Sequence, residues 1–131
     1  MTVLLLQAAA SLAMVGVIWT VQLVQYPGFL DVAPAEFAAF HAAHSRRISM
    51  IVGPLMAVEG VTALWLLAAR PAAIPLWAVL LGLALLAVAL GTTLFVSVPL
   101  HGRLAVAWDA EAIRSLVATN RIRTVAWTAR G

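Results

Sequence analysis

Three long apolar segments dominate this sequence and restrict it to a membrane-spanning fold. They cover residues 3–25, 48–69 and 75–98, and short polar breaks separate them. Each segment reaches the ~20 residues that a helix needs to cross ~30 Å of hydrocarbon. Backbone N–H and C=O groups inside a bilayer must be satisfied within the segment, so each segment is predicted to be a helix.

The composition supports a protein that is solvated by lipid. Hydrophobic residues make up 64% of the 131 positions and charged residues only 10%, which is too little polar surface for a soluble domain. The absence of cysteine excludes disulfides, thiolate metal sites and cysteine nucleophiles. The eight basic residues are arginines that form no patch or stripe, which argues against a nucleic-acid partner. We therefore predict an all-α integral membrane helical bundle, with residues 1–131 as one domain.

The segment after the third apolar run is a candidate fourth helix. It carries several arginines, and we place a candidate fourth span at residues 112–130. At about 100° per helical residue, Arg114 and Arg121 share one side and Arg123 and Arg130 share the opposite side. This pattern favours a helix packed in the bundle, and the alternative is a tail lying on the membrane surface.

Prolines and glycines predict where the helices end or bend. Tyr26-Pro27-Gly28 is expected to end the first span, and residues 34–47 to open a second helix before the span from residue 48. Gly53-Pro54 predicts a kink in the second span. The stretch 99–103 is expected to end the third span.

Three histidines should converge at one end of such a bundle. When the segments cross the membrane alternately, the end of the first span, the start of the second and the end of the third lie on one face. His41, His44 and His101 all fall there, and the spacing of three places His41 and His44 on the same side of a helix. Imidazoles are common ligands of zinc, copper and iron, so we predict a metal or haem-type site. Proton handling without a metal and a purely structural role are the alternatives.

Glu59 defines a second polar level near the middle of the membrane. A carboxylate at that depth should be protonated, paired or facing a cavity. It lies about 22 Å along a helix from His44, too far to share an ion with it. Arg123 and Arg130 in the last helix can reach the same depth in the membrane as Glu59, so either could be its partner. Such a pair would either fix the helix register or handle protons or substrate.

Other polar residues cluster where the spans approach the histidine end. Gln22, Gln25 and Tyr26 could line a substrate pocket or join the helices by hydrogen bonds. Arg46 and Arg47 are interpreted as interfacial charges that set the topology. The arginine distribution predicts that the histidine end faces the cytoplasm of a bacterial inner membrane.

Several motifs resemble those of a family of small bacterial four-span membrane proteins that mostly lack an assigned function. The motifs are Val21-Gln22-x-x-x-Tyr26-Pro27, Phe37-x-x-x-His41-x-x-His44-x-Arg46-Arg47, Pro54-x-Met56-x-x-Glu59, Val98-Pro99-Leu100-His101 and Leu116-Val117-Ala118-Thr119-Asn120-x-Ile122-Arg123-Thr124-x-x-Trp127-x-x-Arg130. More remotely, the chain resembles anthrone-oxygenase-like membrane proteins in its size and span pattern. The first resemblance implies a four-helix membrane bundle and adds Asn120 to the residues at motif positions.

Three functions are compatible with these features. The first is an oxidoreductase that acts on a small lipophilic molecule and uses a metal ion or haem at the histidines. The second is a non-catalytic subunit or assembly factor of a membrane complex, and a homo-oligomer is a further expectation. The third is a small proton-coupled carrier built around Glu59.

Overall fold

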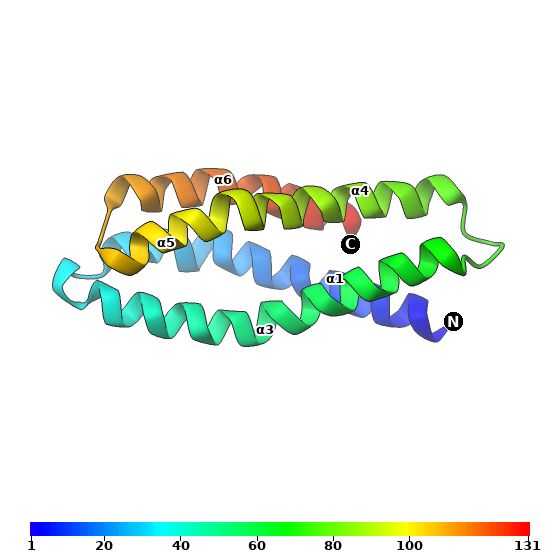
Figure 1. Ribbon diagram of the computed structural model, residues 1–131, viewed down its shortest axis with the longest axis horizontal. Coiled ribbons are helices and arrows are strands. Elements are labelled where there is room, and N and C mark those ends of the chain that lie inside the picture. The colour runs from blue at the N-terminus through cyan, green and yellow to red at the C-terminus, as the bar shows by residue number, and fades with distance from the viewer.

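The chain forms an antiparallel bundle of four helical rods, which confirms the predicted all-α helical bundle (Figure 1). The computed structural model describes all residues, 1–131. In chain order the elements are α1 (Thr2–Thr20), η1 (Val21–Gln25), α2 (Tyr26–Gly28), η2 (Phe29–Asp31), α3 (Pro34–Ala68), α4 (Leu76–Thr92), η3 (Thr93–Ser97), α5 (Val98–Val106) and α6 (Ala110–Arg130). The elements α1 to η2 make one continuous rod, and α4 to α5 make another.

The outer surface of the bundle suits a bilayer. Three helical stretches are long and apolar enough to cross a membrane: Thr2–Asp31, Pro34–Ala68 and Leu76–Val106. Large apolar side chains point outward along all of them, for example Leu23 (66% exposed) and Phe95 (81% exposed). In water such a surface would drive aggregation, whereas in lipid it is the matched surface.

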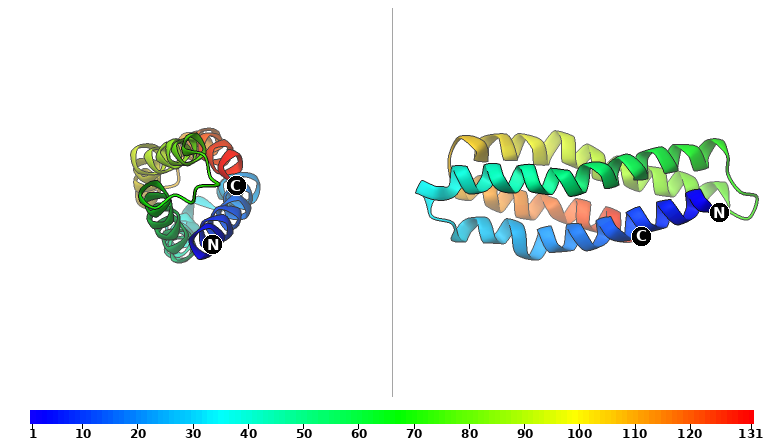
Figure 2. Two further views of the ribbon diagram at one scale, coloured as in Figure 1. Left: turned by 90° about the vertical axis from the view of Figure 1, so that its right-hand side faces the viewer. Right: turned by 90° about the horizontal axis from the view of Figure 1, so that it is seen from below.

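The four rods stand at the corners of a square when viewed end-on (Figure 2). Each of α1 and α4 packs against both α3 and α6, so that polar side chains can meet along the bundle axis. Short connections at residues 32–33 and 107–109 close the end that carries the histidines. The N-terminus and the longer connection between α3 and α4 lie at the other end (Figure 1).

Two helical rods widen into a π-helical turn shortly before a proline. In the first rod, η1 precedes Pro27, and the N–H of Tyr26 bonds to the carbonyl of Val21. In the second, η3 precedes Pro99, and the N–H of Val98 bonds to the carbonyl of Thr93. A proline lacks the N–H of a regular helix, and the wider turn accommodates this loss without ending the rod.

These turns correct two of the predicted helix ends. The first span does not stop at Tyr26-Pro27-Gly28, because helical turns continue to Asp31. The third span does not stop at residues 99–103, because α5 continues to Val106. The prolines were interpreted as terminators, but each sits in the first turn of the helix that follows the π turn, where its missing N–H costs little.

The helix that carries the second span begins where predicted, and the fourth helix is packed as predicted. Residues 34–47 open this helix, since α3 runs without a break from Pro34 through Pro54 to Ala68. In α6, Arg123 is buried and Arg121 is exposed, which matches the predicted division of its arginines between two sides.

Asp109 caps the start of α6. Its carboxylate accepts a hydrogen bond from the N–H of Ala112 at 3.0 Å. It also forms an ion pair with Arg103 at 2.6 Å. The hydrogen bond from the Ala112 N–H is the main reason why the pKa of the Asp109 carboxyl lies below its usual range, and Arg103 lowers this pKa further. This cap fixes where α6 turns back into the bundle.

Candidate functional site

Two of the three histidines meet directly at the closed end of the bundle. His41 projects from α3 and His101 from α5, and His41 Nε2 lies 2.9 Å from His101 Nδ1. The hydroxyl of Tyr26, from α2, lies 3.1 Å from His101 Nε2. Both nitrogens of His101 are therefore engaged, although these residues are far apart in the sequence.

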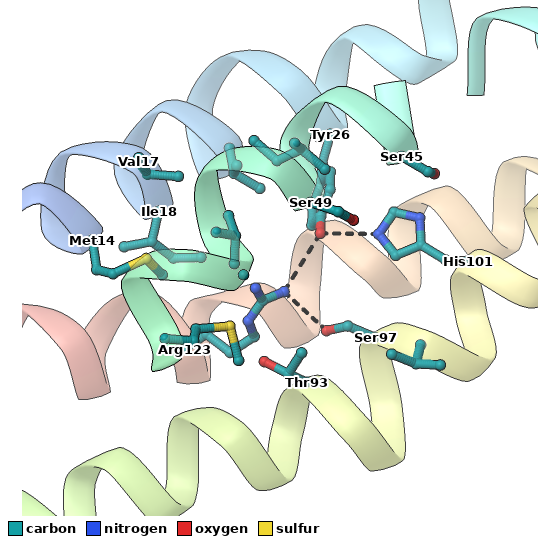
Figure 3. A pocket seen from close by; sticks show the side chains of 16 residues that line it. Met14, Val17, Ile18, Tyr26, Ser45, Ser49, Thr93, Ser97, His101 and Arg123 are labelled. Carbon is teal, nitrogen blue, oxygen red and sulfur yellow. Dashed lines mark hydrogen bonds between the residues drawn. The ribbon is translucent and has the colours of Figure 1, made fainter. Parts of the chain in front are cut away.

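Arg123 gives this chain of hydrogen bonds a direction. Its Nη1 donates to the hydroxyl of Tyr26 at 3.4 Å and to that of Ser97 at 3.1 Å (Figure 3). A guanidinium can only donate, so the Tyr26 oxygen accepts from Arg123 and can donate its own hydrogen to His101 Nε2. A neutral His101 then donates from Nδ1 to His41. This assignment of hydrogens follows from the network and describes a route along which a proton can move.

Phe29 holds the histidine rings in place. It is completely buried, and its ring centroid lies 5.0 Å from that of His44, 5.9 Å from that of His41 and 6.4 Å from that of His101. All three contacts are edge-to-face, the geometry that aromatic rings favour. Phe29 thus fixes the orientation of the imidazoles.

His44 is close to the other histidines but is not hydrogen-bonded to them. Its ring lies nearly parallel to that of His101 with 6.4 Å between centroids, and its buried Nε2 has no hydrogen-bond partner. No three histidine, aspartate or glutamate side chains are grouped so that they could hold a metal ion. The predicted convergence of His41 and His101 is thus direct, and His44 is an aromatic neighbour of the pair.

A cavity of about 310 Å³ lies beside this cluster. His101, Tyr26, Ser97 and Arg123 form its polar wall, and the guanidinium of Arg123 points in among the lining side chains (Figure 3). The apolar lining comes mainly from α1, η1 and α3 and includes Met14, Val17, Ile18, Val21, Ile48, Val52 and Met56. Ser45 and Ser49 of α3 and Thr93 of η3 also line the cavity.

The cavity opens on the side of the bundle between α3 and α5. Three of its lining residues are also exposed on the outer surface, namely Ser49 and Gly53 on α3 and Val98 on α5. A Cβ atom added to Gly53 would meet no other atom within 4 Å. These three residues belong to helical stretches that are long and apolar enough to cross a membrane.

Glu59 forms a second and separate polar cluster further along the bundle. Its buried carboxylate accepts hydrogen bonds from Ser11 at 2.8 Å, from the indole of Trp127 at 2.8 Å and from Arg130 Nε at 3.0 Å. Arg123 and Arg130 were both predicted as possible partners of Glu59, and Arg130 makes the ion pair. Arg130 also donates to the carbonyl of Gly82. The carboxylate is therefore paired, as its depth in the bundle requires.

A third set of polar contacts joins the first rod to α6. Asn120 is completely buried and donates to the side chain of Gln22 at 3.0 Å. Thr124 donates to the same Gln22 oxygen at 3.3 Å, and Gln22 donates to the carbonyl of Val117 at 3.1 Å. Gln22 does not line the cavity beside the histidines. Its contacts match the predicted alternative of hydrogen bonds between helices.

The remaining predicted residues lie outside the cavity. Gln25 and Arg47 line a surface hollow that also contains His44. Arg46 and Arg47 are exposed, a placement that agrees with interfacial charges. Only Tyr26, of the three residues suggested for a pocket, lines the cavity next to His101.

Sequence reasoning missed Phe29 and Ser97 as parts of the site. Phe29 follows Tyr26-Pro27-Gly28, which was expected to end the first span, yet this residue is the centre of the aromatic cluster. Ser97 looked like one small residue in an apolar span, but it accepts a hydrogen bond from Arg123. The nearby Pro99 was the available signal, since a proline in a span often lies next to a distorted turn.

We found no match to this chain among protein-family models, curated proteins or solved structures.

Proposed function

We propose that this protein takes up a small lipophilic molecule from the bilayer and transfers protons to or from it at the chain Tyr26–His101–His41. The observation that carries the proposal is the cavity, which has apolar lining residues, a polar wall that contains Tyr26 and His101, and three exposed lining residues on helical stretches that are long and apolar enough to cross a membrane. Ligand sites are typically of this kind, mostly apolar with a few convergent polar groups.

The size of the cavity limits the ligand. A volume of about 310 Å³ equals that of roughly ten liquid waters at ~30 Å³ each. A compact ring system fits this space better than a phospholipid does. Entry from the side also fits a molecule that dissolves in the membrane first.

Closing the opening tests the proposal. We expect Gly53→Phe to lower the affinity for acetylnaphthalene, a neutral lipophilic probe, by about tenfold or more, because an aromatic ring on this lining residue takes up space that the probe would fill. Binding is measured by calorimetry in lipid nanodiscs. Gly60→Phe is the matched control, since Gly60 lies on the same helix, has no atom within 4 Å of an added Cβ and does not line the cavity. Equal binding by both variants would refute the proposal.

A metal-dependent oxidoreductase is the second candidate, and one distance favours it. His41 Nε2 and His101 Nδ1 face each other at 2.9 Å, close to the ~3 Å between neighbouring ligands that each lie ~2.1 Å from an octahedral ion. His44 Nε2 has no hydrogen-bond partner, and the His44 ring would have to turn from its contact with Phe29 to become a third ligand. A metal or haem iron there would supply redox chemistry next to the cavity.

Metal analysis of the purified protein tests this second candidate. If the protein is a metal-dependent oxidoreductase, the parent protein should contain about one equivalent of a transition metal, and His41→Ala should lose it. Arg47→Ala is the control, because Arg47 is exposed and shares a helix with His41. A parent protein without stoichiometric metal, after growth and purification in metal-supplemented buffers, rules out this candidate.

The other hypotheses receive less support. Three donors, from Ser11, Trp127 and Arg130, satisfy the Glu59 carboxylate, so a fixed structural pair explains this residue better than a proton-coupled carrier does. A role as an accessory subunit or homo-oligomer has no specific observation in its favour. We retain the proposal of a bacterial inner membrane with the histidine end toward the cytoplasm, on the basis of the arginine distribution.

A further inference from the structure

We infer that the ligand of the cavity carries a carboxylate, which binds to the side edge of the Arg123 guanidinium. This inference rests on the proposed function and specifies the chemical class of the ligand. It follows from the charge of Arg123, from its unused hydrogen-bond donors and from the walls around it.

Arg123 is a buried cation without a counter-charge. Its residue is 6% exposed, and arginine stays protonated in proteins. The protein has two ion pairs, Arg103 with Asp109 and Glu59 with Arg130, and Arg123 belongs to neither. The face of Trp127, 5.6 Å from the guanidinium carbon, and two hydroxyl groups are its only compensation. Neutral groups of this kind do not balance a full charge at membrane depth.

The hydrogen bonds of Arg123 leave one edge of the guanidinium unused. Both of its bonds, to Tyr26 and Ser97, come from Nη1. The buried Nε has no hydrogen-bond partner. An Nε–H together with the adjacent Nη2–H forms the planar pair of donors that binds a carboxylate through two parallel hydrogen bonds. Because Nε is covered by its neighbours, the side chains around it must shift to admit the carboxylate. A ketone or an alcohol offers one oxygen and no negative charge, so it can neither form two parallel hydrogen bonds nor balance the charge of the guanidinium.

The walls of the cavity identify the rest of the ligand. Apart from Tyr26, which belongs to the polar wall, eight of the sixteen lining residues have apolar side chains, and this favours a ligand with an apolar part over a small hydrated anion. An aromatic or short aliphatic acid would place its carboxylate at Arg123 and its apolar part against Met14, Ile18 and Val52.

Two probes of matched shape test the inference. Naphthoate and acetylnaphthalene share a ring system and differ in charge. We expect the parent protein in nanodiscs of zwitterionic lipid to bind naphthoate about tenfold or more tightly than acetylnaphthalene, the advantage typical of a charge-assisted hydrogen bond. Acetate at the same concentration should neither bind nor compete, because it lacks the apolar part.

Variants of Arg123 assign the preference to this residue. Arg123→Met should abolish the preference for naphthoate while leaving the binding of acetylnaphthalene within a few fold. Arg123→Lys should retain part of the preference, since it keeps the charge but not the two parallel donors. If Arg123→Met does not fold, the parent protein still decides the matter, because naphthoate should raise its melting temperature more than acetylnaphthalene does at equal concentration.

The outcomes separate this inference from the proposed function. Equal affinity for the two probes, competition by acetate, or a preference that persists in Arg123→Met would each overturn the carboxylate inference while the cavity remains a binding site. If neither probe binds the parent protein, or if Gly53→Phe changes nothing, the proposed function fails as well.

Discussion

Replacing Glu59 by glutamine is expected to lower the free energy of unfolding by about 3 kcal/mol or more. Glutamine has nearly the same shape as glutamate but removes the negative charge, so Arg130 is left as an unpaired cation whose side chain is 5% exposed. The indole of Trp127 and the hydroxyl of Ser11 also lose a charged acceptor, which weakens both hydrogen bonds. Unfolding in mixed micelles, followed by circular dichroism, measures the change.

A second substitution separates the charge from the packing. In Glu59→Gln/Arg130→Met both charges are gone, so we expect the double variant to be more stable than Glu59→Gln alone. Arg121→Met is the control, because Arg121 is an exposed arginine of the same helix. A double variant as unstable as the sum of its single variants would show that Glu59 and Arg130 do not act as a pair.

Replacing Phe29 by alanine is expected to cost about 3 kcal/mol and to disorder the histidine cluster. Phe29 is completely buried and contacts the rings of Tyr26, Phe37, His41, His44 and His101. In lipid the loss comes chiefly from van der Waals contacts and from the cavity left behind, because transfer from water contributes little. The unfolding measurement used for Glu59 also applies here.

Nuclear magnetic resonance of the imidazoles distinguishes local disorder from a general loss of stability. In Phe29→Ala we expect the resonances of His41 and His101 to broaden or merge, because their rings lose the edge-to-face contacts that orient them. Phe40→Ala is the matched control, since Phe40 is 41% exposed and contacts Phe29 from the outside. Sharp and unshifted histidine resonances in Phe29→Ala would contradict the role assigned to this ring.

The sequence was sufficient to predict the bundle because its strongest signals are long and local. An apolar run of twenty or more residues in a chain of this composition is expected to form a membrane-spanning helix. Because successive helices cross the membrane in opposite directions, their order along the chain determines which helix ends lie on the same side. The same reasoning placed His41 near His101 and allowed Arg130 to reach Glu59. These results depend only on counting residues along helices.

The parts that could not be predicted depend on short-range geometry between helices. Counting along a helix could not decide between Arg123 and Arg130 as the partner of Glu59. Both lie on the same side of α6, and their depths in the membrane were not known closely enough to choose one. Nor could it place Ser97 next to Arg123, since a single serine in an apolar span has no distinctive pattern. The helix ends near Pro27 and Pro99 were wrong because each proline follows a π turn, and no simple sequence rule specifies such a turn.

Each π turn closes with one more residue than an α-helical turn, so the extra residue is absorbed within that turn. Removing one residue from η1 would leave an ordinary α-helical turn, and Tyr26 would keep nearly the same direction relative to α1. The same holds for η3 and His101. A lineage of such proteins could therefore lose single residues at these two points and keep the arrangement of its chemical groups, whereas a deletion within α1 would turn all the residues that follow by about 100° relative to those before it.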